Sequence, residues 1–255
     1  WKDYEVLDTS GGEKLERWGD YLLVRPDPQV IWNTKKENPG WKKKNGHYHR
    51  SSKGGGEWEF FHLPEQWEIN YKDLTFRLKP FSFKHTGLFP EQATNWDWFG
   101  DLIRRANRPI KVLNLFAYTG TATCYAADGG VEETVTVDLS NTYLDWAERN
   151  MRQNGFVGPQ HHFVRDDVLA WIRDQRQTDN RWDLIFCDPP TFSNSSKMGR
   201  RTWDVQRDHV ELLAGVSRLL AQGGHAIFSC NLRGFRPETR KLARAGVCLL
   251  YTSDA

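Results

Sequence analysis

The sequence predicts an α/β fold in which helices cover a parallel sheet, preceded by a small antiparallel β module. Its 255 residues are 38% hydrophobic and 27% charged, which is enough chain for one large domain, or one domain plus a smaller module, with a real core. After residue 110, apolar strand-like segments alternate with helical segments, an order typical of parallel sheets. Eight of the twelve tryptophans and a Gly/Lys/Asn-rich stretch lie before residue 100, so the first part of the chain differs in composition.

The first part of the chain contains segments with the alternation expected of half-buried strands. Tyr4–Asp8 and Tyr21–Val24 flank a turn at Ser10–Gly12, and Trp67–Tyr71 is joined by a tight turn to Leu74–Lys79. These segments predict a small antiparallel β module over residues 1–80, followed by a second domain over residues 81–255.

A lysine-rich loop is expected within the first module. The segment Lys35–Lys53 holds seven basic residues against one acidic residue, Glu37, a local charge of +6. Such a run is either a solvated loop or a contact surface for a polyanion, and RNA is the polyanion that we consider below.

The second domain is predicted to contain five parallel strands, each followed by a helix. A helix over Pro90–Asn107 precedes the first strand and should lie against this domain. The predicted strands are 111–116, 134–138, 162–165, 182–187 and 225–229, and the predicted helices begin near 121, 141, 168, 203 and 237.

Ligands bind at the carboxyl ends of the strands in such sheets, and three of these ends carry candidate residues. The first strand leads into a tight turn at Gly120, where backbone N–H groups can approach a ligand closely. The second ends at Asp138, whose carboxylate can accept both hydroxyls of a ribose. The third ends at Asp167, which can accept the exocyclic amine of an adenine. The alternative role for both carboxylates is helix capping, by Asp138 together with Ser140 for the helix near 141 and by Asp167 for the helix near 168.

The fourth strand ends in the most specific local signal of the chain, Asp188-Pro-Pro-Thr-Phe192. Two prolines fix φ and remove two donors, so the carbonyls of the turn should stay rigid and free to accept hydrogen bonds. Phe192 can stack on a flat base. The chain lacks a GxGxxG motif, which counts against a nicotinamide- or flavin-dependent dehydrogenase.

Together these segments resemble the class I S-adenosylmethionine-dependent methyltransferases, which have a Rossmann-like fold. The sequence is most similar to the bacterial 23S rRNA methyltransferases that modify guanine N7, followed by their cytosine-C5 relatives. The resemblance runs from about Lys84 to Phe235 and includes Thr191–Ser195 and Asp204–His209. It implies S-adenosylmethionine as the cofactor and RNA, specifically 23S rRNA, as the partner. Because the methyl group of a sulfonium is already activated, the reaction is expected to need no metal, and reduced cysteines fit a cytoplasmic protein.

The resemblance also assigns roles to single residues. The segment Phe116–Gly120 would surround the methionine end of the cofactor, while Asp138 would hold the ribose and Asp167 the adenine amine. Asp188 and the Pro189 carbonyl would face the methyl group and the target base. The expected cofactor-binding residues are Thr86, Gln92, Asn114, Phe116, Ala117, Tyr118, Thr119, Gly120, Asp138, Leu139, Asp167, Val168 and Asp188, and the expected catalytic residues are Asp188, Pro189, Phe192 and Cys230.

The target atom decides which of these residues are catalytic. A guanine N7 lone pair needs no deprotonation, so Asp188 would act by hydrogen bonding and Phe192 by stacking a base taken out of its RNA context. Cytosine C5 requires a thiolate to add to C6, and Cys230 stands where the cytosine relatives are expected to keep their nucleophile. Guanine N7 is the leading prediction and cytosine C5 the alternative. A nucleotide-dependent oxidoreductase and an RNA-binding fragment are the alternatives from other classes.

Two further features concern the cysteines and the end of the chain. The four cysteines include no CxxC pair, which favours reduced thiols, and neither a secretory leader nor a run of eighteen apolar residues occurs, so we expect no membrane association. Class I methyltransferase sheets usually end in an antiparallel hairpin, but only one further strand, Val247–Thr252, fits here. We therefore expect a truncated C-terminal hairpin.

Overall fold

The computed structural model describes residues 1–51, 55–81, 83–194 and 202–249, and it divides the chain into two compact units. Unit 1 is Trp1–Ala93 and unit 2 is Thr94–Ala255. The predicted boundary at residues 80/81 falls earlier than this division. Residues after 80 still contact unit 1, because the Lys79 N–H donates to the Thr86 carbonyl at 3.0 Å and Arg25 donates to the Lys84 carbonyl at 3.0 Å.

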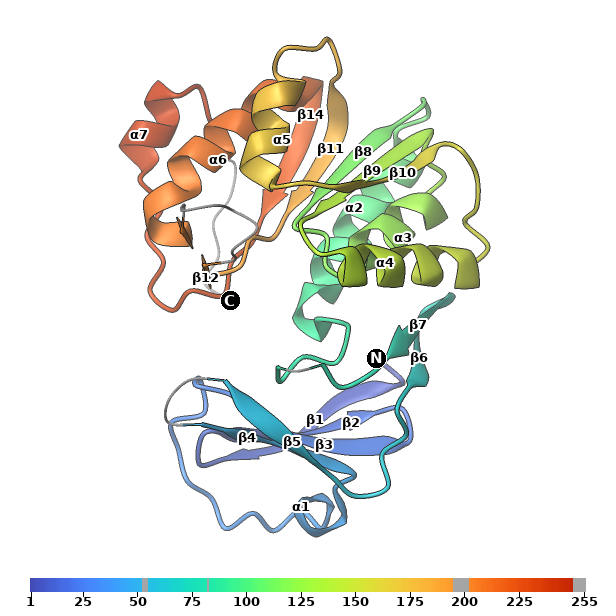
Figure 1. Cartoon of the computed structure of the whole chain (residues 1–255), viewed down its shortest axis with the longest axis vertical. Helices are drawn as coiled ribbons and strands as arrows, with labels where there is room; N and C mark the ends of the chain where they lie inside the picture. Colours follow the sequence, from blue (N-terminus) through green and yellow to red (C-terminus); the bar gives the residue numbers. More distant parts are fainter. Residues whose placement is uncertain (52–54, 82, 195–201, 250–255) are drawn as a thin grey trace. The chain divides into compact units, whose positions relative to one another are not determined.

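Unit 1 contains a five-stranded sheet, a two-stranded hairpin and a short helix (Figure 1). The sheet has the order β1-β2-β3-β4-β5, and all its pairs are antiparallel except β3 with β4. The hairpin joins β6 to β7 at the positions predicted for it. The elements are β1 (Tyr4–Ser10), β2 (Glu13–Trp18), β3 (Tyr21–Pro26), α1 (Gly40–Lys43), β4 (Gly46–Arg50), β5 (Gly56–Phe60), β6 (Trp67–Tyr71) and β7 (Leu74–Leu78).

The predicted β module is confirmed, but three of its strands were missed. β2 lacks the apolar alternation that predicts a strand, because one of its fully buried positions holds the charged Glu16. In β4 the face opposite the two histidines holds Gly46 and Arg50 as well as Tyr48, so a single apolar residue marks the strand. Its partner β5 is only five residues long. The segment Lys35–Lys53, predicted as a loop, contains α1 and β4, and its residues 52–53 lie outside the described residues.

A buried ion pair replaces apolar packing at the centre of the unit 1 sheet. Arg25 donates from Nε and Nη2 to the two carboxylate oxygens of Glu16 at 2.6 and 2.8 Å, and Tyr4 donates to the same carboxylate at 2.7 Å. Burial alone would raise the pKa of Glu16, but Arg25 outweighs it and holds this pKa below its ordinary value. The Arg25 guanidinium also lies 5.0 Å from the centre of the Trp18 ring.

Unit 2 contains a parallel sheet of five described strands with the order β10-β9-β8-β11-β14 (Figure 1). A minimal antiparallel pair, β12 (Phe192–Ser193) with β13 (Trp203–Asp204), follows β11. The predicted order of strands and helices is confirmed. The strands are β8 (Lys111–Leu115), β9 (Glu133–Asp138), β10 (His161–Arg165), β11 (Trp182–Cys187) and β14 (Leu220–Phe228), and the helices are α3 (Thr121–Asp128), α4 (Asn141–Gln153), α5 (Val168–Gln175), α6 (Val205–Leu219) and α7 (Thr239–Arg244).

The helix predicted over Pro90–Asn107 forms as a 3₁₀ turn, η1 (Pro90–Gln92), followed by α2 (Ala93–Arg105). As predicted, α2 packs on the second domain. Trp96 stacks on Tyr125 of α3 at a ring-centroid distance of 5.2 Å, and Phe99 contacts Phe186 of β11 at 6.0 Å.

One hydrophobic core cluster of unit 2 lies between the sheet and the helices α5 and α6. It joins apolar residues of β8, β9 and β11 to those of the two helices. The ends of the strands are thereby fixed against one another. Among the described residues, no helix combines the length and the apolar character that a membrane span requires.

The chain after β14 differs from the sequence prediction. The described part of the predicted strand, residues 247–249, is not in a strand, and residues 250–255 lie outside the described residues. All four cysteines are free thiols in the structure, as their spacing predicts.

Candidate active site at the carboxyl edge of the parallel sheet

The register of three neighbouring strands brings the main candidate residues into one row. Leu115 of β8 is paired with Val137 of β9 on one side and with Cys187 of β11 on the other. Phe116 and Asp188 directly follow β8 and β11, and Asp138 is the last residue of β9, so the three residues lie in one row at the carboxyl edge of the sheet. Asp138 and Asp188 are two strand spacings apart, which corresponds to about 10 Å.

The loop after β8 has an unusual backbone. Phe116, Tyr118 and Gly120 have positive φ angles of 56°, 51° and 73°. Two non-glycine residues in this region cost conformational energy, and such strain is found mainly where the backbone serves a function. Hydrogen bonds fix the turn, since the Ala117 N–H donates to the Val137 carbonyl at 3.2 Å and the Gly120 N–H to the Ala117 carbonyl at 2.9 Å.

Side chains along this loop alternate between the interior and the accessible side. Ala117 and Thr119 are buried, whereas Phe116 and Tyr118 are half-buried. Phe116 contacts Trp203 at a ring-centroid distance of 5.8 Å. The loop thus presents backbone and aromatic surface at the edge of the sheet.

Helix α4 packs against the end of the loop and requires glycine there. A Cβ on Gly120 would lie 2.5 Å from the Ala147 Cβ. The fully buried Asn150 donates from its side-chain amide to the Thr119 carbonyl at 2.9 Å. The close approach at Gly120 and the hydrogen bond at Thr119 together hold the loop in one conformation.

Asp138 holds the loop from the neighbouring strand. Its two carboxylate oxygens accept the Tyr118 N–H at 3.0 Å and the Ser140 N–H at 2.8 Å. The cap of α4 is Ser140, whose hydroxyl accepts the Tyr143 N–H at 3.4 Å. Asp138 is therefore not the helix cap that was its alternative role. Burial, followed by the Asp138 charge, raises the pKa of Tyr143.

Asp167, in contrast, is a helix cap. Its Oδ1 accepts the Ala170 N–H at 2.9 Å at the start of α5. The next residue, Val168, is 3% exposed and belongs to the hydrophobic core, and Leu139 beyond β9 is half-buried. The structure thus shows Asp167 in the capping role, and its contact with an adenine amine stays a prediction.

Asn114 points into the interior of unit 2. Its side-chain amide donates to the Thr123 hydroxyl at 2.9 Å, which lies 2.9 Å from the Thr136 hydroxyl. Asn114 is 2% exposed. This buried polar network ties β8, α3 and β9 together, so Asn114 supports the start of the loop through its neighbours.

The turn after β11 is held on both sides. The Ser229 hydroxyl donates to the Asp188 carboxylate at 2.7 Å, and the Trp203 indole donates to the Pro190 carbonyl at 2.6 Å. The prediction that the carbonyls of this turn stay free is therefore wrong at Pro190. Pro189 is buried, while Phe192 has 56% of its surface exposed.

Cys230 follows β14 two residues after its end. It is half-buried and packs against the core of unit 2. Burial, together with the negative charge of Asp188, raises the pKa of its thiol. This environment favours the protonated thiol over the thiolate.

The remaining two candidates, Thr86 and Gln92, belong to unit 1. Thr86 is fully buried, and its hydroxyl makes no hydrogen bond with the described residues. Gln92 ends the η1 turn. Their proposed contact with a cofactor therefore stays a prediction.

The sequence analysis missed three residues that shape this edge: Tyr143, Asn150 and Ser229. Tyr143 lies against Tyr118 at a ring-centroid distance of 4.7 Å. Asn150 had a detectable signal, because it lies on the apolar face of α4 with Ala147 and Met151, where a polar residue needs a partner. The sequence contains no comparable signal for Tyr143 or Ser229, since neither residue departs from the polarity pattern of its neighbours.

Comparisons with known proteins give a family. The family model of the S-adenosylmethionine-dependent methyltransferases matches residues 36–240. The chain is 40% identical over 186 residues to the ribosomal RNA large subunit methyltransferase K/L of Photobacterium profundum, covering 73% of this chain and 25% of that protein. It is 46% identical over 180 residues to the protein of the same name from Shewanella amazonensis, covering 71% and 24%.

The chain thus spans about a quarter of the length of these curated relatives. A solved structure, the SAM-dependent methyltransferase from Agrobacterium tumefaciens, superposes with a TM-score of 0.87 at 28% identity. The superposition covers 96% of this chain and 79% of that one, so it includes both units. The family match likewise covers most of the chain, and we conclude that this protein belongs to the S-adenosylmethionine-dependent methyltransferase family.

Proposed function

We propose that this chain transfers a methyl group from S-adenosylmethionine to a base of large-subunit ribosomal RNA in the cytoplasm, with guanine N7 as the acceptor. The observation that carries the proposal is the row formed by Phe116, Asp138 and Asp188 at one edge of the sheet. The relatives named as rRNA methyltransferases support the choice of RNA. The family match argues against an oxidoreductase or a purely RNA-binding fragment.

The residues at this edge fit the cofactor in their chemistry. The strained loop Phe116–Gly120 offers backbone groups to the amino-acid end, and the Asp138 carboxylate has the acceptor oxygens that a ribose diol requires. Asp167 retains one oxygen for the adenine amine after capping α5. When bound, S-adenosylmethionine supplies a methyl group that is already activated on a sulfonium.

The protein's own contribution is then to orient the acceptor and exclude water. Orientation of this kind is worth about 7–11 kcal/mol. Ser229 fixes the Asp188 carboxylate, which can accept a hydrogen bond from the base, and the exposed ring of Phe192 offers a stacking surface. Because guanine N7 has an available lone pair, no residue needs to remove a proton from it.

Cytosine C5 is the second candidate acceptor, and it depends on Cys230. A thiolate would have to add to C6 of the ring. The raised pKa of Cys230 opposes formation of this thiolate, and its packing against the core is that of a structural cysteine. We therefore favour guanine N7 as the acceptor.

Replacing Cys230 by serine separates the two acceptors. We expect Cys230→Ser to keep methyl transfer within about threefold of the unchanged protein, because serine preserves the packing and no nucleophile is lost. The measurement is methyl transfer to unmodified large-subunit rRNA, followed by mass spectrometry of the methylated nucleoside. Complete loss of turnover, with a covalent RNA adduct in the unchanged protein, would assign the reaction to cytosine C5.

Replacing Asp138 tests the cofactor site directly. Asp138→Asn should abolish the rise in melting temperature caused by S-adenosylhomocysteine, because an amide cannot accept from both ribose hydroxyls and two backbone N–H groups. Asp145→Asn, on the exposed face of α4, is the matched control and should keep the full rise. Equal rises in melting temperature in the two variants would show that Asp138 does not bind the cofactor.

A further inference from the structure

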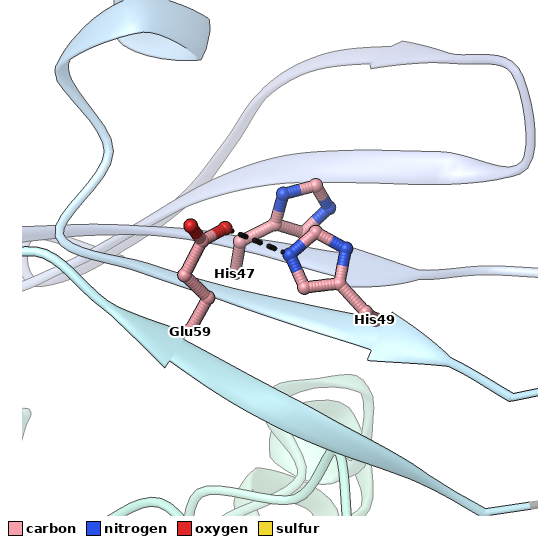
Figure 2. Close-up of side chains that lie close together, drawn as sticks. All are labelled: His47, His49 and Glu59. Carbon is pink, nitrogen blue, oxygen red and sulfur yellow. Dashed lines mark hydrogen bonds and ion pairs between the residues drawn. The ribbon is translucent and has the colours of Figure 1, made fainter.

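A cluster of imidazole and carboxylate groups lies on the five-stranded sheet of unit 1. His47 and His49 are two residues apart on β4, so both side chains project from the same face of the sheet. Glu59 of β5 is the direct antiparallel partner of His47. Strand pairing, rather than a flexible loop, therefore brings the three side chains together, as Figure 2 shows.

The donor atoms of these residues lie close enough for one ion. One ring nitrogen of each histidine and one Glu59 carboxylate oxygen are all within 4.8 Å of one another. The His49 Nε2 is 2.9 Å from the Glu59 carboxylate, and the two imidazole rings are 3.9 Å apart at their centres. Small side-chain rotations would bring all three donors to the distances of about 2.0–2.2 Å that zinc requires.

Glu13 of β2, a strand of the same sheet, supports the cluster. Its Oε1 lies 2.6 Å from the His47 Nε2, and its Oε2 accepts from Lys36 at 2.7 Å. A carboxylate hydrogen-bonded to a ring nitrogen fixes the orientation of the imidazole, as outer partners of metal-binding histidines do. His47 is accordingly the most shielded of the three, with 16% of its side chain exposed, while His49 and Glu59 are 48% and 52% exposed.

The donor set indicates the class of ion. Two imidazoles and one carboxylate suit late first-row divalent metals, whereas magnesium and calcium prefer oxygen donors alone. We propose that His47, His49 and Glu59 bind a divalent transition-metal ion of the zinc class, which cross-links β4 to β5. The exposed side of the cluster gives the ion access from solvent and leaves a coordination position for water.

Metal titration of the untagged chain tests this site. Co²⁺ should develop visible ligand-field absorption that saturates at one ion per chain, and Zn²⁺ should displace it. His49→Gln and Glu59→Gln should each weaken Zn²⁺ binding by about tenfold or more, measured by calorimetry. Mg²⁺ should not compete.

A second pair in the protein provides a matched control. His162, which is exposed, and Glu133, which is half-buried, also form a histidine–glutamate pair, with nitrogen and oxygen 3.4 Å apart, but they are not part of the three-donor cluster. His162→Gln should leave the titration unchanged, and circular dichroism should show that all three variants are folded. Absence of Co²⁺ absorption in the unchanged chain, or equal Zn²⁺ affinity with and without His49, would overturn the proposal.

Discussion

At the scale of single residues, the loop after β8 leaves no room for a side chain at Gly120. A methyl group there would meet the Ala147 Cβ at 2.5 Å, and the φ angle of +73° is itself unfavourable for any residue with a Cβ. Since the same loop accepts a hydrogen bond from Asn150 of α4 and donates one to Asp138, movement at this point changes the backbone that would contact the cofactor.

Gly120→Ala is therefore predicted to weaken S-adenosylhomocysteine binding by at least about tenfold, because strain and a clash of about 1–3 kcal/mol each displace the loop. Calorimetric titration with S-adenosylhomocysteine measures the effect. Gly130→Ala is the control, since Gly130 has a φ angle of +84° but no atom within 4 Å of the point that a Cβ would occupy. Equal affinities in the two variants would show that the close approach at Gly120 does not govern binding.

The sequence predicted single residues best where backbone geometry leaves few options. The turn at Gly120 and the row containing Asp138 and Asp188 lie at strand ends. Such ends can be recognised in the sequence as the points where a short apolar run stops. The sequence left two roles open for Asp167, binding of an adenine amine and capping of α5, because an acidic residue at this position serves both. The structure shows Asp167 as the cap of α5. Ser229 could not be predicted, because its partner Asp188 is 41 residues away in the chain.

At the scale of secondary structure elements, β2 and β3 are joined by a buried ion pair. Glu16 is fully buried, and Arg25 is 5% exposed. Breaking such a pair leaves an uncompensated buried charge, which typically costs about 3–5 kcal/mol. The same pair explains why the alternation of β2 is hard to recognise: a charge occupies a position where the pattern requires an apolar residue.

Glu16→Gln is expected to lower the free energy of unfolding by about 3–5 kcal/mol, because the Arg25 charge remains buried without its partner. Urea unfolding followed by tryptophan fluorescence measures the decrease. Glu5→Gln removes the partner of Arg17 from an exposed pair with a nitrogen–oxygen distance of 3.4 Å, and it should cost less than about 1 kcal/mol. A cost for Glu16→Gln no greater than that for Glu5→Gln would contradict the prediction.

The parallel sheet was the part of the fold most accessible from sequence, because its strands are short apolar runs that alternate with capped helices. The sheet of unit 1 was less accessible, since β2 buries the charged Glu16 and β4 has Tyr48 as its single apolar residue. The strand β4 also pairs in parallel with β3 through two residue pairs, and local patterns do not specify such long-range pairing.

At the scale of the whole molecule, the chain combines unit 2, which holds the candidate active site, with a β-rich unit 1 that carries the lysine-rich segment. Within unit 1, a surface cavity of about 290 Å³ is lined by Lys42, Lys43, Lys44, Asn45, Phe61 and His62. The Lys44 Nζ lies 5.2 Å from the centre of the Phe61 ring. Charge beside an aromatic ring is a combination that suits single-stranded nucleic acid, so we propose that this cavity binds the RNA substrate.

Replacing Lys42, Lys43 and Lys44 together by alanine should flatten the salt dependence of RNA binding. Removing one lysine–phosphate interaction reduces the slope of log affinity against log salt by about 0.7–0.9, so removing three reduces it by roughly 2–3. Filter binding of rRNA fragments at several salt concentrations measures the slope. Alanine at Arg105, Arg149 and Arg218, which are exposed in unit 2, is the charge-matched control. The same slope in both triple variants would show that the lysines of this cavity do not contact RNA phosphates.

The hydrogen bond from Arg25 to the Lys84 carbonyl has a practical consequence for dividing the gene. A fragment that ends at residue 80 would lack the Lys84 carbonyl, which accepts a hydrogen bond from the Arg25 guanidinium. It would also lack the Thr86 carbonyl, which accepts the Lys79 N–H. A fragment that ends at residue 93 keeps both hydrogen bonds. Because the shorter fragment lacks them, we expect proteases to cleave it more readily than the longer one.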